Sequence, residues 1–153
     1  MSENIRGALF NALGELDGLS VLDAFAGSGA LGFEAISRGA SSTVLVEADR
    51  LAQKTIAENI QTLGLEAKAK LVKASANAWL STTTEEFDIV LADPPYDDLQ
   101  MPLLIRLAER AKSSGIIVFS LSPNVVVELP ANYERLANKS YGDAQLVFYR
   151  RVV

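Results

Sequence analysis

Residues 20–32 read SVLDAFAGSGALG, an apolar run that leads into three closely spaced glycines. The run predicts a buried β-strand, followed by a loop and then a helix. Gly27, Gly29 and Gly32 fit the pattern G-x-G-x-x-G, which lets the backbone approach a nucleotide-like ligand where the strand ends. For Gly32 we favour a simpler role, because a glycine there permits close packing of the helix on the strand.

Short β-branched runs alternate with longer helical patterns along most of the chain. This alternation predicts an α/β fold, a doubly wound sheet of five parallel strands with helices on its faces. After Pro123 the pattern changes, and two further strands are predicted to form an antiparallel hairpin around residues 141–144, at one edge of the sheet. The predicted strands are 20–25, 43–47, 70–74, 87–92, 116–121, 133–140 and 145–151, and the predicted helices are 2–16, 29–38, 49–63, 76–80 and 103–111.

The chain has 153 residues, which predicts a single domain over residues 1–153, with residues 1–17 as a helix that packs on the sheet. It contains no cysteine and no histidine. Thiol nucleophiles, Ser-His-Asp triads and metal sites built from thiolate or imidazole are therefore excluded, and we expect no metal. Carboxylate, hydroxyl, amide and backbone groups remain, so we expect any activity to depend on a reactive cofactor.

The 19 Asp and Glu residues outnumber the 14 Lys and Arg residues, and the net charge is −5. This balance argues against a protein that coats nucleic acid by bulk attraction, although it is compatible with a local basic face. No apolar run approaches the ~20 residues of a membrane-spanning helix, and no signal-peptide pattern opens the chain. We therefore expect a cytoplasmic protein with no membrane partner, and a monomer by default.

Two acidic residues lie near the glycine loop. Glu47 follows Gly27 by 20 residues, at the end of the next predicted strand, where its carboxylate can accept hydrogen bonds from both hydroxyls of a ribose. Asp23 lies just before the loop, and we expect its charge to face the ligand. A carboxylate there repels a pyrophosphate and attracts the ammonium and sulfonium of S-adenosylmethionine, so this cofactor is favoured over a dinucleotide. The alternative, a purely structural Asp23, needs a buried partner, because a lone buried carboxylate is costly.

The fourth predicted strand ends in Asp93, Pro94, Pro95 and Tyr96, at the same carboxyl edge of the sheet as the glycine loop. The two prolines remove two backbone N–H donors and leave carbonyl acceptors at the cleft. Asp93 adds carboxylate acceptors, and the ring of Tyr96 provides a flat face for stacking. These groups suit a planar ligand with an exocyclic amino group, whose hydrogens they hold while its nitrogen attacks a methyl donor. The alternative is that the prolines only end the strand and Asp93 caps the next segment.

The glycine loop, residues 93–96 and four shorter segments resemble those of the RsmD-type methyltransferases; the shorter segments are 5–11, 37–40, 46–50 and 141–143. That family methylates the N2 amino group of a guanine in small-subunit ribosomal RNA, on the seven-stranded class I methyltransferase fold. The resemblance therefore implies this Rossmann-like fold, S-adenosylmethionine as cofactor, and ribosomal RNA or the small-subunit particle as partner. An adenine-N6 methyltransferase, a glutamine-amide methyltransferase and a binding module without activity remain alternatives.

The resemblance also implies a role for individual residues. The catalytic residues that meet the target base are then Asp93, Pro94, Pro95 and Tyr96. The residues implied for cofactor binding are Asp23, Phe25, Gly27, Ser28, Gly29, Glu47, Ala48, Ser75, Ala76 and Asp93. Two features depart from the family pattern. Ser75 stands where the family usually has an Asp or Asn to receive the adenine amino group, and the family's basic N-terminal hairpin is not found ahead of the first helix.

Overall fold

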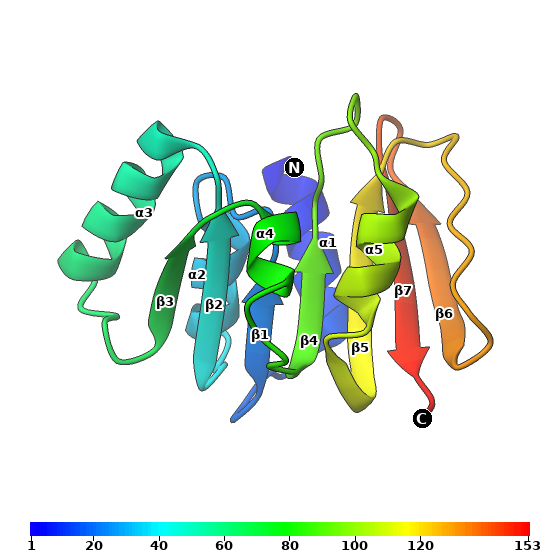
Figure 1. The fold of residues 1–153 in the computed structure, drawn as a ribbon, viewed down its shortest axis with the longest axis horizontal. Coiled ribbons are helices and arrows are strands. Elements are labelled where there is room, and N and C mark those ends of the chain that lie inside the picture. Colours follow the sequence, from blue (N-terminus) through cyan, green and yellow to red (C-terminus); the bar gives the residue numbers. More distant parts are fainter.

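Helices and strands alternate along most of the computed structural model, which describes residues 1–153 (Figure 1). The predicted alternation is confirmed, and most elements begin and end close to the predicted residues. In chain order the elements are α1 (Glu3–Leu13), β1 (Ser20–Asp23), α2 (Ala30–Ser37), β2 (Ser42–Glu47), α3 (Arg50–Thr62), β3 (Ala69–Lys73), α4 (Ala76–Leu80), β4 (Phe87–Ala92), α5 (Met101–Ala108), β5 (Ala111–Leu121), β6 (Tyr133–Ser140) and β7 (Gln145–Arg151).

The boundary between α5 and β5 differs from the prediction. The spacing of Leu107 and Ala111 predicts one helical face, but α5 ends at Ala108 and Ala111 already pairs with Phe87 in the sheet. The Phe87 N–H donates to the Arg110 carbonyl at 2.7 Å, which draws the chain into the sheet directly after the helix. The predicted helical position of Ala111 is therefore wrong, because hydrogen bonding to a distant strand outweighs local periodicity.

The seven strands form one sheet in the order β3-β2-β1-β4-β5-β7-β6. Strands β1 to β5 are parallel, and β7 is antiparallel to both β5 and β6. This confirms the predicted mostly parallel sheet with an antiparallel C-terminal hairpin. The strand order reverses between β1 and β4, and ligands of open α/β sheets bind outside the carboxyl ends of the strands at such a point.

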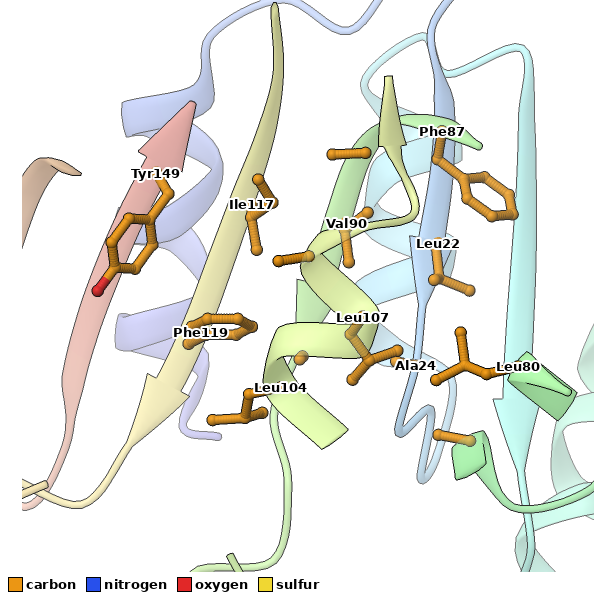
Figure 2. Close-up of a cluster of buried hydrophobic side chains, with 14 of the residues drawn as sticks. Leu22, Ala24, Leu80, Phe87, Val90, Leu104, Leu107, Ile117, Phe119 and Tyr149 are labelled. Atoms are coloured by element: carbon orange, nitrogen blue, oxygen red, sulfur yellow. The ribbon is translucent and has the colours of Figure 1, made fainter. Parts of the chain in front are cut away.

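Helices cover both faces of the sheet. In Figure 1, α4 and α5 lie in front of the sheet, and α1 and α2 lie behind it. On the front face, Leu104 and Leu107 of α5 belong to the same buried cluster as Phe119 of β5 (Figure 2). On the other face, Leu45 of β2 packs with Ile56 of α3. The central strands β1, β2 and β4 are largely apolar on both faces because both faces are buried, as in other parallel sheets, whereas most of the edge strand β6 is exposed.

Helix α1 packs against the rear face of the sheet. Ser2 caps the helix, since its hydroxyl accepts a hydrogen bond from the Ile5 N–H at 3.2 Å. Leu9 and Phe10 are buried in the same cluster as Val21 of β1. No helix of the structure combines the length and apolar character that crossing a membrane requires.

Candidate active site

A cavity of about 840 Å³ opens along the carboxyl edge of the parallel strands, where the strand order reverses. Its wall is built from the segments that follow β1, β2, β3 and β4, from the start of α1 and from the β6–β7 turn. Sites for cofactors and small ligands typically have volumes of roughly 300–1,000 Å³. The cavity is therefore large enough for a nucleoside-sized ligand and part of a second molecule.

Glycine is required for two different reasons in the loop between β1 and α2 and in the first turn of α2. Gly27 and Gly29 have φ values of +56° and +87°, in the left-handed region that other residues rarely adopt. Gly27 lines the cavity, whereas Gly29 is the residue at the start of α2. Gly32 has the packing role that we expect from the sequence, since a Cβ atom there would lie 2.6 Å from Leu45 Cδ2.

Glu47 connects this loop to the end of β2. One carboxylate oxygen accepts a hydrogen bond from the Gly27 N–H (2.7 Å), and the other accepts from the Asp49 N–H (2.8 Å). These contacts fix the side chain at the wall of the cavity, next to Ala48. Each oxygen keeps a further lone pair, so the carboxylate can also accept from two neighbouring hydroxyl groups of a ligand.

Asp23 does not face the cavity, contrary to the expectation. Successive side chains of a strand point to opposite faces, and here Ala24 lines the cavity whereas Asp23 is fully buried toward α2. One oxygen accepts from the Gly32 N–H at 3.1 Å, and the other has no hydrogen-bond partner. Burial, with smaller contributions from the charges of Asp93 and Glu47, raises the pKa of Asp23 to about 7, although the Gly32 hydrogen bond opposes the shift. Asp23 therefore connects the end of β1 to the first turn of α2 through this hydrogen bond.

The segment after β3, at the start of α4, forms another part of the wall. Ser75, Ala76 and Asn77 line the cavity here. The Ser75 hydroxyl accepts a hydrogen bond from the Ala78 N–H at 3.1 Å and thereby caps α4. The Asp that is usual at this position in the family that the sequence resembles would offer a second oxygen, which the Ser75 hydroxyl lacks.

The loop after β4 forms a further part of the wall, and all of residues 93–96 line the cavity. The Asp93 carboxylate is partly exposed, and its Oδ2 lies 3.6 Å from the Met1 nitrogen. Because this carboxylate is partly exposed at the cavity wall, an amino group of a ligand can reach it. Tyr96 is 44% exposed, and its hydroxyl lies 3.4 Å from Ser120 Oγ. Much of the Tyr96 ring is thus open to a stacking partner.

Most of the residues that we expect at the site share this cavity. Those that line it are Phe25, Gly27, Glu47, Ala48, Ser75, Ala76, Asp93, Pro94, Pro95 and Tyr96. The three that do not are Asp23, Ser28 and Gly29. Asp23 and Gly29 are buried, whereas Ser28 is exposed outside the cavity.

Several lining residues have no role in the sequence-based prediction, among them Asn77, Asp98 and Asp143. The sequence offered a reason to place Asp143 at the site, because Asp143 belongs to segment 141–143, which contributes to the family resemblance. Asn77 is two residues beyond Ser75, but side-chain direction in a five-residue helix is not readable from sequence. Asp98 lies in an irregular loop outside any motif.

Four side chains that line the cavity carry carboxylates: Glu47, Asp93, Asp98 and Asp143. No Lys or Arg side chain is part of the wall. Such a wall attracts cations and amino groups and repels phosphate. No cluster of three His, Cys, Asp or Glu residues is arranged to hold a metal ion.

The fold defines the class of protein. Magnesium protoporphyrin IX methyltransferase from Synechocystis PCC 6803, solved with bound S-adenosylmethionine, matches with a TM-score of 0.72 at 15% identity, over 97% of this chain and 77% of that chain. At this identity the likeness concerns the fold alone. The seven-stranded sheet is thus the fold of S-adenosylmethionine-dependent methyltransferases.

Sequence relatives define the family. Ribosomal RNA small subunit methyltransferase D of Escherichia coli K12 is 33% identical over 98% of this chain and 78% of its own length. The structure of yhhF from Escherichia coli matches with a TM-score of 0.90 at 30% identity, over 99% of this chain and 86% of that chain. The family model described as "Conserved hypothetical protein 95" matches residues 1–150. The chain belongs to this family, the RsmD methyltransferases.

Proposed function

We propose that this protein transfers a methyl group from S-adenosylmethionine to an exocyclic base nitrogen of ribosomal RNA, and that the nitrogen is N2 of a guanine in the small subunit. The observation that carries the proposal is one cavity with Glu47 on one wall and residues 93–96 on the other. A 33% identical relative whose name is that of a small-subunit rRNA methyltransferase supports the RNA substrate. Such a substrate implies a cytoplasmic location.

The residues present fit S-adenosylmethionine. Glu47 offers both carboxylate oxygens at the wall, where the two hydroxyls of a ribose can meet them. The left-handed Gly27 leaves the wall beside Glu47 without a side chain, so a ligand can approach the backbone. The carboxylate of Asp93 adds negative potential at the cavity wall for a ligand that carries an ammonium and a sulfonium.

The chain's own residues position the target amine and stabilise its charge. When bound, S-adenosylmethionine supplies a methyl group on a positively charged sulfur, which departs as a neutral thioether. The Asp93 carboxylate accepts a hydrogen bond from the target amine and stabilises the positive charge that develops on the amine nitrogen. The same carboxylate can take the proton that this nitrogen loses, or pass it to water. Pro94 and Pro95 have no N–H, so they leave the acceptors of this part of the wall free for the amine. The Tyr96 ring stacks on the base and fixes its plane.

Transfer of a tritiated methyl group tests the proposal. The purified protein is supplied with S-adenosylmethionine and with small-subunit ribosomal RNA, small-subunit particles, DNA or protein extract in separate reactions. We expect label only in ribosomal RNA, and N2-methylguanosine in the nucleoside digest. N6-methyladenosine or methylated glutamine would instead support the corresponding alternative enzyme. No transfer, together with no S-adenosylmethionine binding at millimolar ligand by calorimetry, would identify a binding module.

A further inference from the structure

The β6–β7 turn brings to the cavity a carboxylate that the reaction described above does not use. Asp143 lies on the cavity wall, and Figure 1 shows this turn beside the loop after β4, at the same edge of the sheet. One strand, β5, separates β4 from β7, so these two strands lie about 10 Å apart. Asp93 follows β4 and Asp143 precedes β7. The two carboxylates therefore flank the part of the cavity in which the target base is expected.

The backbone that carries Asp143 is held in place on both sides. The Tyr141 N–H donates to the Ala144 carbonyl at 2.8 Å, and Gly142 has a φ of +66° at the first central position, as in the two-residue type II′ hairpin turn. Ala144 is buried in the core against the rear face of the sheet. The buried Gln145 amide donates to the Val125 carbonyl at 2.6 Å, which ties the hairpin to the loop after β5. Because the backbone of this turn is fixed, the Asp143 side chain has a defined position relative to a ligand in the cavity.

The chemistry of Asp143 limits what it can recognise. No basic side chain lines the cavity, and no ion pair within the structure involves Asp143. An ionised carboxylate accepts hydrogen bonds and donates none. In guanine the ring position next to the N2 amino group is N1–H, a donor, whereas N1 of adenine is an acceptor. A carboxylate that faces N1 therefore attracts guanine and repels adenine.

We propose that Asp143 selects guanine as the target base by accepting a hydrogen bond from N1–H. The inference rests on the proposed function, because it requires a guanine whose N2 amino group is held at Asp93. Asp143 is then a specificity-determining residue that the C-terminal hairpin supplies. The division of roles is that Asp93 holds the reacting amine and Asp143 reads the neighbouring ring position.

RNA that carries 2-aminopurine at the target position tests this role. This base keeps the amino group at C2, but its N1 is an acceptor without a hydrogen. We expect the wild-type kcat/KM for the guanine RNA to exceed that for the 2-aminopurine RNA by at least about tenfold, as for other well-placed base contacts. Asp143→Asn should lower kcat/KM on guanine and bring the ratio close to one, because its amide can also donate to an N1 acceptor.

A control on the same hairpin separates this effect from a change of charge. Glu134 lies on β6, is exposed and does not line the cavity, so Glu134→Gln should keep the wild-type ratio of the two RNAs. Affinity for S-adenosylmethionine, measured by calorimetry, should be the same in both variants and the wild type. An Asp143→Asn protein that loses activity equally on both RNAs overturns the inference and leaves the proposed function intact. A wild-type protein that forms no N2-methylguanosine in any RNA overturns both.

Discussion

The Glu47 carboxylate accepts a hydrogen bond from the Gly27 N–H at 2.7 Å, and so ties the end of β2 to the glycine loop after β1. The two strands are parallel neighbours, which brings residues 20 positions apart together at one edge of the sheet. Asp93 lies at the end of β4, on the other side of β1. The Glu47 carboxylate thus lies beside the glycine loop, and the Asp93 carboxylate lies beside Pro94 and Pro95. Their removal should have different consequences.

Substitution of each carboxylate by alanine separates binding from transfer. Glu47→Ala should weaken S-adenosylmethionine binding by about 10- to 100-fold, because hydrogen bonds to a charged group contribute about 1.5–3 kcal/mol. Asp93→Ala should lower the rate of transfer by about 100-fold or more, since it removes a group that acts on the developing charge. Calorimetry with S-adenosylmethionine and single-turnover transfer to RNA measure the two effects. Equal losses of binding in both variants, with transfer otherwise unchanged, would contradict this assignment.

Tyr96 should act through its ring rather than through its hydroxyl. The hydroxyl is 3.4 Å from Ser120 Oγ, a long contact, and Tyr96 is 44% exposed. Tyr96→Phe should therefore retain transfer within about twofold, whereas Tyr96→Ala should raise the KM for RNA by roughly tenfold, since stacking on a base contributes about 1–3 kcal/mol. Steady-state kinetics on the RNA substrate distinguish the two. A large loss in Tyr96→Phe would assign a role to the hydroxyl.

Local patterns in the sequence were sufficient for the strands, the helices and the cavity residues that adjoin a motif. The glycine loop and the segment 93–96 both follow predicted strands, so parallel pairing alone brings them to one edge. Two outcomes depend on tertiary structure and could not be predicted this way. Ala111 leaves the helical pattern because Phe87 pairs with it across the sheet. Asp23 turns away from the cavity because the Gly32 N–H provides a buried donor at the start of α2.

Asp23 should make stability depend on pH. Its ordinary pKa is 3.8, and burial raises the pKa to about 7 in the folded protein. Between these values the folded state keeps a proton that the unfolded state has lost, so the unfolding free energy should fall as pH rises from about 4 to 7 and then level off. The fall corresponds to roughly 4 kcal/mol at most. The Asp23→Asn variant has no ionisable group at this position, so this fall in the unfolding free energy should be absent from it.

The measurement is urea denaturation of the wild type and Asp23→Asn at several pH values from 4 to 8. Groups other than Asp23 can also make stability depend on pH, although Asp88 does not do so between pH 4 and 8, because hydrogen bonds from Ser20 and the charge of Lys112 lower its pKa despite partial burial. The difference between the two proteins therefore carries the information, not the slope of either. Asp97→Asn, at an exposed position outside the cavity wall, should follow the wild-type curve. Parallel curves for wild type and Asp23→Asn would show that Asp23 ionises normally.

Gly32 should be intolerant of even a methyl group. A Cβ atom there would lie 2.6 Å from Leu45 Cδ2 and 3.1 Å from Thr43 Cγ2, and both of these side chains are buried. Gly32→Ala should lower the unfolding free energy by about 1–3 kcal/mol, as overpacked cores do. Gly7→Ala is the matched control, because Gly7 lies in α1 with open space around its Cβ position and should gain about 0.5–1 kcal/mol of helix stability. Urea denaturation of both variants measures these changes in the unfolding free energy. A loss in Gly32→Ala with a gain in Gly7→Ala would show that packing outweighs helix propensity at Gly32.

Ser75→Asp should strengthen binding of the cofactor's adenine. Asp caps a helix as well as Ser, so the hydrogen bond from the Ala78 N–H and the start of α4 should persist. The second oxygen adds an acceptor at the cavity wall, where the adenine amino group is expected, and should improve the affinity for S-adenosylhomocysteine by about two- to tenfold. Calorimetry with S-inosylhomocysteine, which lacks that amino group, is the control, and no gain is expected there. An equal gain for both ligands would show that the added negative charge acts at a distance, and no gain for either would place the adenine away from Ser75.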